Sequence, residues 1–106
     1  MCYIVLHYID ERMKISGLQW DDINLEHIIA KHVLSPKEVE DVCFGTHYAC
    51  PAKYNRKAIY GQAASGKYLM VIVERLYGSV YRVVTARGMK ISENRKYRMI
   101  MRQRGS

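Results

Sequence analysis

The chain has 106 residues, which is enough for one compact domain and leaves little room for a second. Hydrophobic residues make up 49% of it, so a real core can form and general disorder is excluded. Lysine and arginine total 17 against 10 acidic residues, a net charge of +7 that favours nucleic acid, an acidic protein or anionic lipid as partner, with simple solubility as the alternative.

The first residues carry an apolar run over 3–9 that is too short to span a bilayer. It also lacks the basic start and the small-residue cleavage site of a signal peptide, so we expect no membrane association. The three cysteines form no CxxC pair, which favours a reducing cytoplasm. We expect residues 1–12 to be an N-terminal extension of uncertain structure and residues 13–104 to form a single domain.

Two helices are predicted in the first half, after a short strand that ends at Trp20. Asp21 is a suitable N-cap for a helix that runs to about His32. A second helix is predicted to begin at Ser35-Pro36, to close a capping box with Glu38 and to end at Gly45.

The second half changes to the period of strands. Turns at 64–66 and 77–78 indicate hairpins, so neighbouring strands should be antiparallel. The expected strands are Thr46–Pro51, Lys57–Ala64, Lys67–Tyr77 and Ser79–Arg87. Ser92 is expected to cap a last, basic helix over about Glu93–Arg102. The predicted fold class is α+β: an antiparallel four- to five-stranded sheet packed by two N-terminal helices and one C-terminal helix.

Several short motifs occur in the order found in a known family. They are Trp20-Asp21, Lys31-His32, Glu38 after Ser-Pro, Gly66-Lys67-Tyr68-Leu69, the segment Tyr81–Arg87 with its Thr-Ala-Arg ending, and Glu93, Arg95 and Tyr97. Together they resemble the BrnT toxins of bacterial toxin–antitoxin pairs, over roughly residues 13–100. The chain departs from the family pattern at Asn24, Ile28, Val33 and Asn94. It therefore resembles a divergent branch that keeps the fold and changes part of the usual polar set.

The resemblance implies a RelE-like ribonuclease fold and RNA cleavage that arrests growth. It also implies an antitoxin partner with a ribbon-helix-helix domain, through which the complex would reach operator DNA. Whether the chain forms a homo-oligomer stays open.

Metal-free RNA cleavage needs proton transfer at the 2′-hydroxyl and positive charge around the phosphate. The candidates for catalysis are His32, Glu38 and Arg87. The candidates for substrate binding are Lys31, Arg95, Tyr97 and Arg98. Each has a structural alternative: a core histidine, a capping-box glutamate, a lysine favoured at a helix C-terminus, a packing tyrosine or a solvated helix face.

Two further groups of side chains have a chemical interpretation. Four tyrosines could stack on unpaired bases, although tyrosine is equally common in strands for packing: Tyr48, Tyr54, Tyr60 and Tyr68. Cys43, His47 and Cys50 lie close in sequence, but a helix end separates them and no fourth ligand is evident, so we expect no metal and no cofactor.

The leading hypothesis is a metal-independent endoribonuclease toxin that cleaves RNA. The alternative is a non-catalytic binding module of the same fold, motivated by the altered positions Asn24, Ile28 and Val33. Direct binding of DNA by the basic last helix is a third hypothesis.

Overall fold

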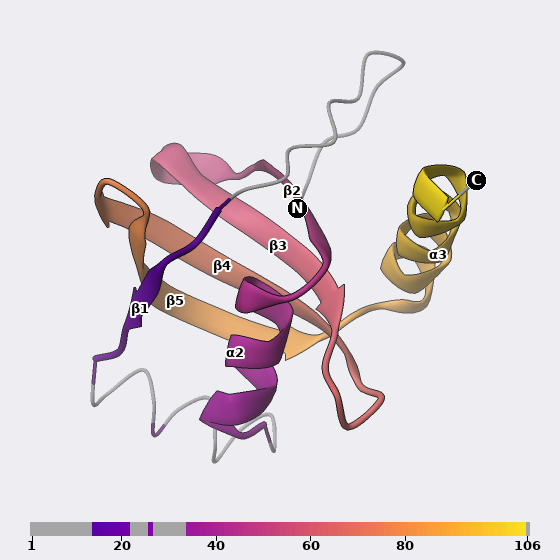
Figure 1. Ribbon diagram of the computed structural model, residues 1–106, viewed down its shortest axis with the longest axis horizontal. Coiled ribbons are helices and arrows are strands. Elements are labelled where there is room, and N and C mark those ends of the chain that lie inside the picture. Colours follow the sequence, from indigo (N-terminus) through magenta and orange to yellow (C-terminus); the bar gives the residue numbers. More distant parts are fainter. Residues whose placement is uncertain (1–13, 22–25, 27–33, 106) are drawn as a thin grey trace.

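The computed structural model describes residues 14–21, 26 and 34–105 (Figure 1). The expected extension over 1–12 lies outside these residues. So does the expected helix over 21–32, apart from Asp21 and Glu26.

A mixed sheet of five strands forms the centre of the described part, in the order β1-β5-β4-β3-β2. The strands are β1 (Gly17–Gln19), β2 (His47–Pro51), β3 (Arg56–Gln62), β4 (Tyr68–Tyr77) and β5 (Val80–Gly88). The four later strands pair antiparallel, as predicted. The prediction of a wholly antiparallel sheet was wrong, because β1 pairs parallel to β5, with Gly17 opposite Val80. Hairpin turns fix the direction of consecutive strands, but no local signal fixes the direction of a strand that pairs across some sixty residues.

The predicted hairpin turns are confirmed. Gly66 and Gly78 have φ values of 100° and 51°, in the region that glycine adopts without steric cost. Each turn joins strands that are hydrogen-bonded neighbours, β3 to β4 and β4 to β5. The composition of the turns therefore sets the order of the central strands.

Helix α2 (Pro36–Phe44) forms by the predicted capping box. Ser35 Oγ accepts from the Glu38 backbone N–H at 3.2 Å, and Glu38 Oε1 accepts from the Ser35 N–H at 2.9 Å. Its apolar side is fully buried on one face of the sheet. That core contains Val39, Val42, Cys43, Ala49, Ile59, Leu69, Val71, Val73, Val83 and Ala86.

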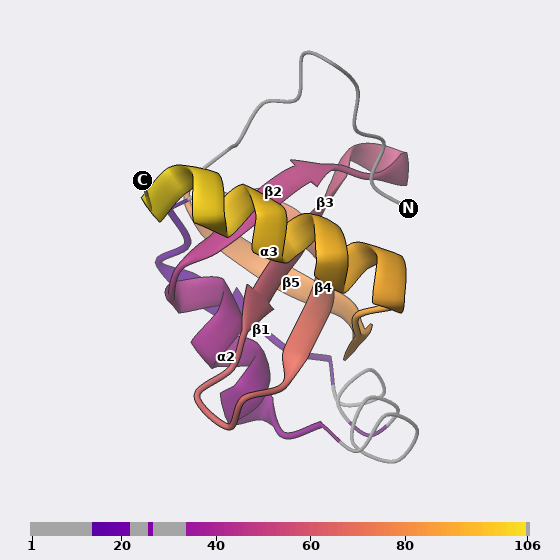
Figure 2. The same cartoon turned by 90° about the vertical axis from the view of Figure 1, so that its right-hand side faces the viewer.

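Helix α3 (Ile91–Gly105) covers the other face of the sheet (Figure 2). Its Tyr97 and Ile100 pack on Tyr48, Tyr60 and Met70, which alternate along the strands with residues of the first core. The Ser92 cap was wrong, because the helix begins at Ile91 and Asn94 donates to the carbonyl of Lys90. Within the described part of the chain, no helix is long and apolar enough to cross a bilayer.

Candidate nucleic-acid interface

An open groove lies between the start of β4, the end of β5 and the first turns of α3. Its volume is about 620 Å³. It is lined by Leu34, Lys67, Tyr68, Leu69, Gly88, Met89, Ile91, Asn94, Arg95 and Arg98. The hairpin turn that ends at Gly66 positions Lys67, Tyr68 and Leu69 on one wall of the groove. The short connection from β5 to α3 places the helix on the other wall.

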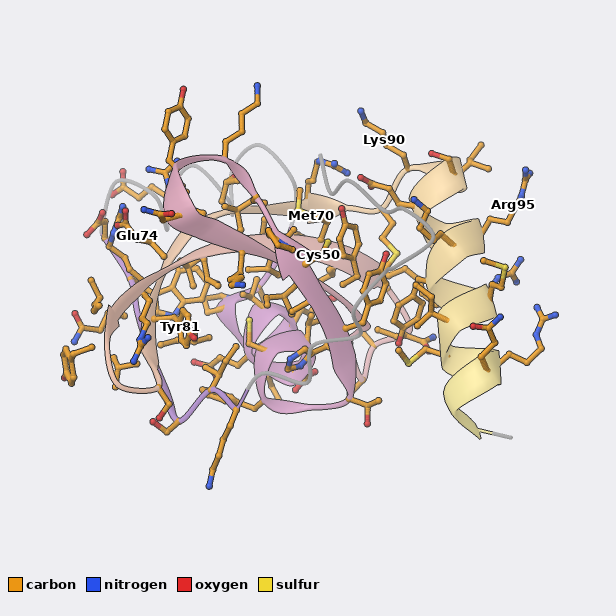
Figure 3. The ribbon with its side chains drawn as sticks, turned by 90° about the horizontal axis from the view of Figure 1, so that it is seen from above. Cys50, Met70, Glu74, Tyr81, Lys90 and Arg95 are labelled. Carbon is orange, nitrogen blue, oxygen red and sulfur yellow. The ribbon has the colours of Figure 1, made fainter. Side chains whose placement is uncertain are left out.

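The charged side chains of this groove are cations. Arg95 and Arg98 lie three residues apart, on one face of α3, and both are exposed. Within the described part of the chain, neither makes an ion pair. Figure 3 shows Arg95 pointing outward from α3. The third cation, Lys67, pairs with Glu38, at 3.2 Å between Nζ and Oε2. The groove therefore presents a positive field beside apolar and aromatic walls.

Arg87 leaves β5 next to this groove but does not line it. Its guanidinium makes a two-pronged ion pair with Glu93 of α3, Nη1 to Oε1 at 2.8 Å and Nη2 to Oε2 at 2.9 Å. Nη1 also donates to the carbonyl of Gly88 at 2.9 Å, and Glu93 Oε1 accepts from the Lys90 backbone N–H at 2.8 Å. The arginine thus joins the sheet to the beginning of the helix.

The two partners of this ion pair shift each other's pKa. The hydrogen bonds that Arg87 donates to Glu93 raise the pKa of Arg87, although burial opposes this shift. Burial alone would raise the pKa of the Glu93 carboxyl, but hydrogen bonds from Arg87 and Lys90 and their charges outweigh it and lower that pKa. Both groups are therefore charged at neutral pH.

The Glu38 carboxylate accepts hydrogen bonds from three donors. Besides its capping bond it accepts from Ser65 Oγ at 2.6 Å and from Lys67 Nζ. The hydrogen bond from Ser65, then the Ser35 backbone bond and Lys67, lower the pKa of Glu38 to about 2, against the effect of burial. A carboxylate with this pKa is a weak base and holds no proton to donate at neutral pH, which favours the capping interpretation.

Tyr97 is buried among other tyrosines rather than in the groove. Its ring stacks on Tyr48, with centroids 6.1 Å apart, and meets Tyr68 edge to face at 5.8 Å. Tyr48 in turn stacks on Tyr60 at 4.9 Å. Burial raises the pKa of Tyr97. Its surroundings favour the packing role.

The structure thus brings some predicted site residues together and leaves others apart. Arg95 and Arg98 share the groove, while Arg87 and Tyr97 lie beside and beneath it. Lys31 and His32 lie outside the described residues, so their roles stay predictions. Leu34, two positions after His32 in the sequence, lines the groove.

Sequence reasoning missed two polar lining residues as parts of the site. Lys67 follows the turn glycine directly, a position that projects from the end of a hairpin. Asn94 precedes Arg98 by four residues and so shares its helix face. Both signals were available in the sequence.

The three side chains considered as metal ligands lie on α2 (Cys43) and β2 (His47 and Cys50), and Cys50 is disulfide-bonded. In the described ranges, no three metal-ligating side chains come together. Cys43 is buried in the α2 core, and that burial, followed by the charge of Glu40, raises the pKa of its thiol to about 12. His47 Nδ1 lies 3.0 Å from the carbonyl of Gly45.

In the part of the chain that the structure describes, a five-stranded mixed sheet with a helix on each face and a basic groove at one end defines a small, basic α+β domain. The same fold is found in the ribonuclease toxin BrnT of Brucella abortus, with a TM-score of 0.60 and 21% sequence identity. The match covers 70% of this chain and 96% of the toxin, which confirms the expectation of a divergent BrnT-like fold. No family model matches the sequence, and no curated protein matches it.

Proposed function

We propose that this protein is a toxin-type ribonuclease that binds single-stranded RNA in the groove between β4 and α3 and cleaves it without a metal. The observation that carries the proposal is the pair of exposed arginines, Arg95 and Arg98, on the wall of a groove that is also lined by an aromatic ring. A polyanion with flat bases complements such a surface.

Phosphate binding falls to the cations of the groove. The planar guanidinium of arginine offers paired donors that match two phosphate oxygens, so Arg95 and Arg98 would hold neighbouring phosphates of the backbone. Lys67 would contribute charge while it stays bound to Glu38. Tyr68, half-buried on the opposite wall, offers a ring on which a base could stack.

Proton transfer would fall to His32, whose ordinary pKa lies near neutrality. Lys31 would add positive charge near the phosphate. Arg87 would act through Glu93, by fixing the start of α3 and with it the position of Arg95. Tyr97 would support the same helix from below.

The test uses purified protein, labelled single-stranded RNA and EDTA. Wild-type protein should cleave the RNA, and Arg95→Ala with Arg98→Ala should lose both binding and cleavage. His32→Ala should bind as the wild type does and lose cleavage. Lys37→Ala removes one exposed cation on α2 that does not line the groove, and should behave as the wild type.

Intact RNA after long incubation with folded wild-type protein would reject the ribonuclease. The second candidate, a non-catalytic binding module, would then account for retained binding. Two observations favour this alternative: Arg87 is engaged by Glu93, and Glu38 has a pKa of about 2. Growth on induced expression separates the two candidates, because only the nuclease should arrest it.

The partner that follows from the proposal is an antitoxin with a ribbon-helix-helix domain, which would carry the complex to operator DNA in the cytoplasm. Co-expression of a ribbon-helix-helix protein encoded beside this chain should restore growth. Failure to restore growth, with both proteins folded, would reject that partner.

A further inference from the structure

The turn between β2 and β3 has an unusual backbone for its sequence. Tyr54 has φ 62° and ψ 36°, and Asn55 has φ 59°. The Arg56 N–H donates to the Lys53 carbonyl, so the two residues occupy the centre of a turn of the I′ kind. Such turns favour asparagine, aspartate or glycine, and asparagine fits the second position. Tyrosine at the first position is strained, and local folding does not explain it.

The ring of Tyr54 is not used for packing. The residue is 80% exposed, the most exposed tyrosine of the described chain, whereas Tyr48 and Tyr60 are buried. One face of the ring lies under the Arg56 guanidinium, 5.6 Å from the ring centroid. Because the residue is so exposed, the rest of the ring is open to solvent.

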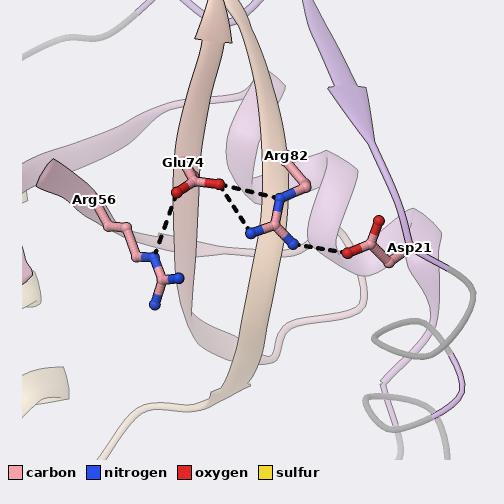
Figure 4. Close-up of polar contacts among 4 residues, drawn as sticks. All are labelled: Asp21, Arg56, Glu74 and Arg82. Carbon is pink, nitrogen blue, oxygen red and sulfur yellow. Dashed lines mark hydrogen bonds and ion pairs between the residues drawn. The ribbon is translucent and has the colours of Figure 1, made fainter. Parts of the chain in front are cut away.

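A charged network of Asp21, Glu74 and Arg82 lies beside Arg56 (Figure 4). Arg56 Nε lies 4.0 Å from Glu74 Oε2, and Glu74 Oε1 accepts from Arg82 Nε and Nη2 at 3.2 and 2.9 Å. Arg82 Nη1 reaches Asp21 Oδ2 at 2.8 Å. Arg56 therefore lies within ion-pair distance of Glu74 on β4, although its Nε makes no hydrogen bond to any described residue.

The tip of this hairpin, residues 53–57, reads Lys-Tyr-Asn-Arg-Lys, with three cations and no acid. We infer that it is a second binding site, on which an unpaired RNA base stacks against Tyr54 while Lys53 contacts the adjoining phosphate. An exposed aromatic ring among cations is the arrangement that binds single strands without sequence preference. A protein partner would need an apolar patch wider than this one ring.

The hairpin tip and the groove lie at opposite ends of the molecule. Figures 1 and 3 both place the β2–β3 turn at the end of the sheet away from α3. A short RNA could occupy one site and a longer strand both. The inference rests on the proposed function only for the choice of RNA as ligand, because its geometry is independent of the groove.

The experiment measures the affinity of a fluorescent 20-nucleotide uridine RNA at several salt concentrations. Tyr54→Asn removes the ring and relieves the strained turn, so the variant should fold at least as well as the wild type. We expect it to bind about fivefold more weakly or worse, with the slope of log affinity against log salt unchanged, because stacking releases no counterions. Tyr54→Phe keeps the ring and should restore the affinity. Tyr77→Asn, a change at another exposed tyrosine, should have no effect.

Separate outcomes distinguish this site from the groove. Weaker binding and a smaller salt slope in Arg95→Ala, with unchanged binding by Tyr54→Asn, would overturn the hairpin site alone. Weaker binding by Tyr54→Asn, with Arg95→Ala unchanged, would overturn the groove alone. Absence of any RNA binding by the wild type would overturn both.

Discussion

Replacing Arg87 with alanine should destabilise the fold, because Glu93 would remain in the protein without its counter-ion. The Glu93 side chain is 10% exposed and that of Arg87 27%. In the variant the carboxylate would keep the Lys90 backbone bond and lose both guanidinium bonds.

The magnitude follows from the two hydrogen bonds and the burial. Removing one partner of a fully buried ion pair costs about 3–5 kcal/mol. Because Arg87 is partly exposed, water can enter the space it leaves, so we expect a loss of about 2–3 kcal/mol. At about 4–8 °C per kcal/mol for a domain of this size, the melting temperature should fall by roughly 10–20 °C.

The assay is urea unfolding of the wild type, Arg87→Ala, Glu93→Gln and the double variant. The cycle should give a coupling energy of at least about 1 kcal/mol. The destabilisation by Arg87→Ala should shrink as the pH falls. In the wild type the pKa of Glu93 is lowered, so the pair stabilises above the ordinary carboxyl range and loses its effect below it. In Arg87→Ala, burial raises the pKa of Glu93, so this carboxylate becomes protonated at a higher pH than in the wild type. Protonation removes the cost of burying its unpaired charge. The reasoning would be refuted if Arg87→Ala and Glu93→Gln had additive effects on the free energy of unfolding and if the destabilisation by Arg87→Ala did not change with pH.

Three further predictions concern other parts of the fold. Because the pKa of Glu38 is lowered to about 2, its ionised carboxylate stabilises the folded protein above about pH 4.5, and this contribution is lost toward about pH 2. Ser65→Ala should raise the pKa of Glu38 in an NMR titration, and an unchanged pKa would contradict the role given to the Ser65 hydrogen bond. Gly61→Ala should destabilise the fold by about 1–3 kcal/mol in urea unfolding, because its Cβ would lie 2.9 Å from a side chain of α2, whereas Gly17→Ala meets only ordinary contacts; equal effects would contradict the packing. Cys43 should resist alkylation in the folded protein, measured by peptide mass spectrometry, and rapid native labelling would contradict its burial.

Local signals predicted most of the fold. The capping box at Ser35 and the turn glycines depend only on residues that are close in sequence. For this reason α2 and the strands β2 to β5 begin and end within one or two residues of their predicted ranges. The parallel pairing of β1 depends on contacts across some sixty residues, which no local pattern encodes. The start of α3 was predicted too late in the sequence: the helix begins at Ile91, and the Glu93 carboxylate accepts from the backbone N–H of Lys90, just before it.

The candidate site was less accessible from the sequence. The exposed side of α3 follows from its charge, so Arg95 and Arg98 could be found. The engagement of Arg87 could not, because it depends on the angle at which α3 returns to the sheet after β5. The same limit applies to Tyr54, since composition alone does not separate it from the buried tyrosines.

The central claim is that the groove between β4 and α3 binds the RNA backbone through Arg95 and Arg98. The most direct measurement compares the salt dependence of RNA affinity for the wild type and for the variant that carries Arg95→Ala and Arg98→Ala. Two lost phosphate contacts on a single strand should reduce the slope of log affinity against log salt by about 1.4. Equal slopes and equal affinities in the two proteins would contradict the account.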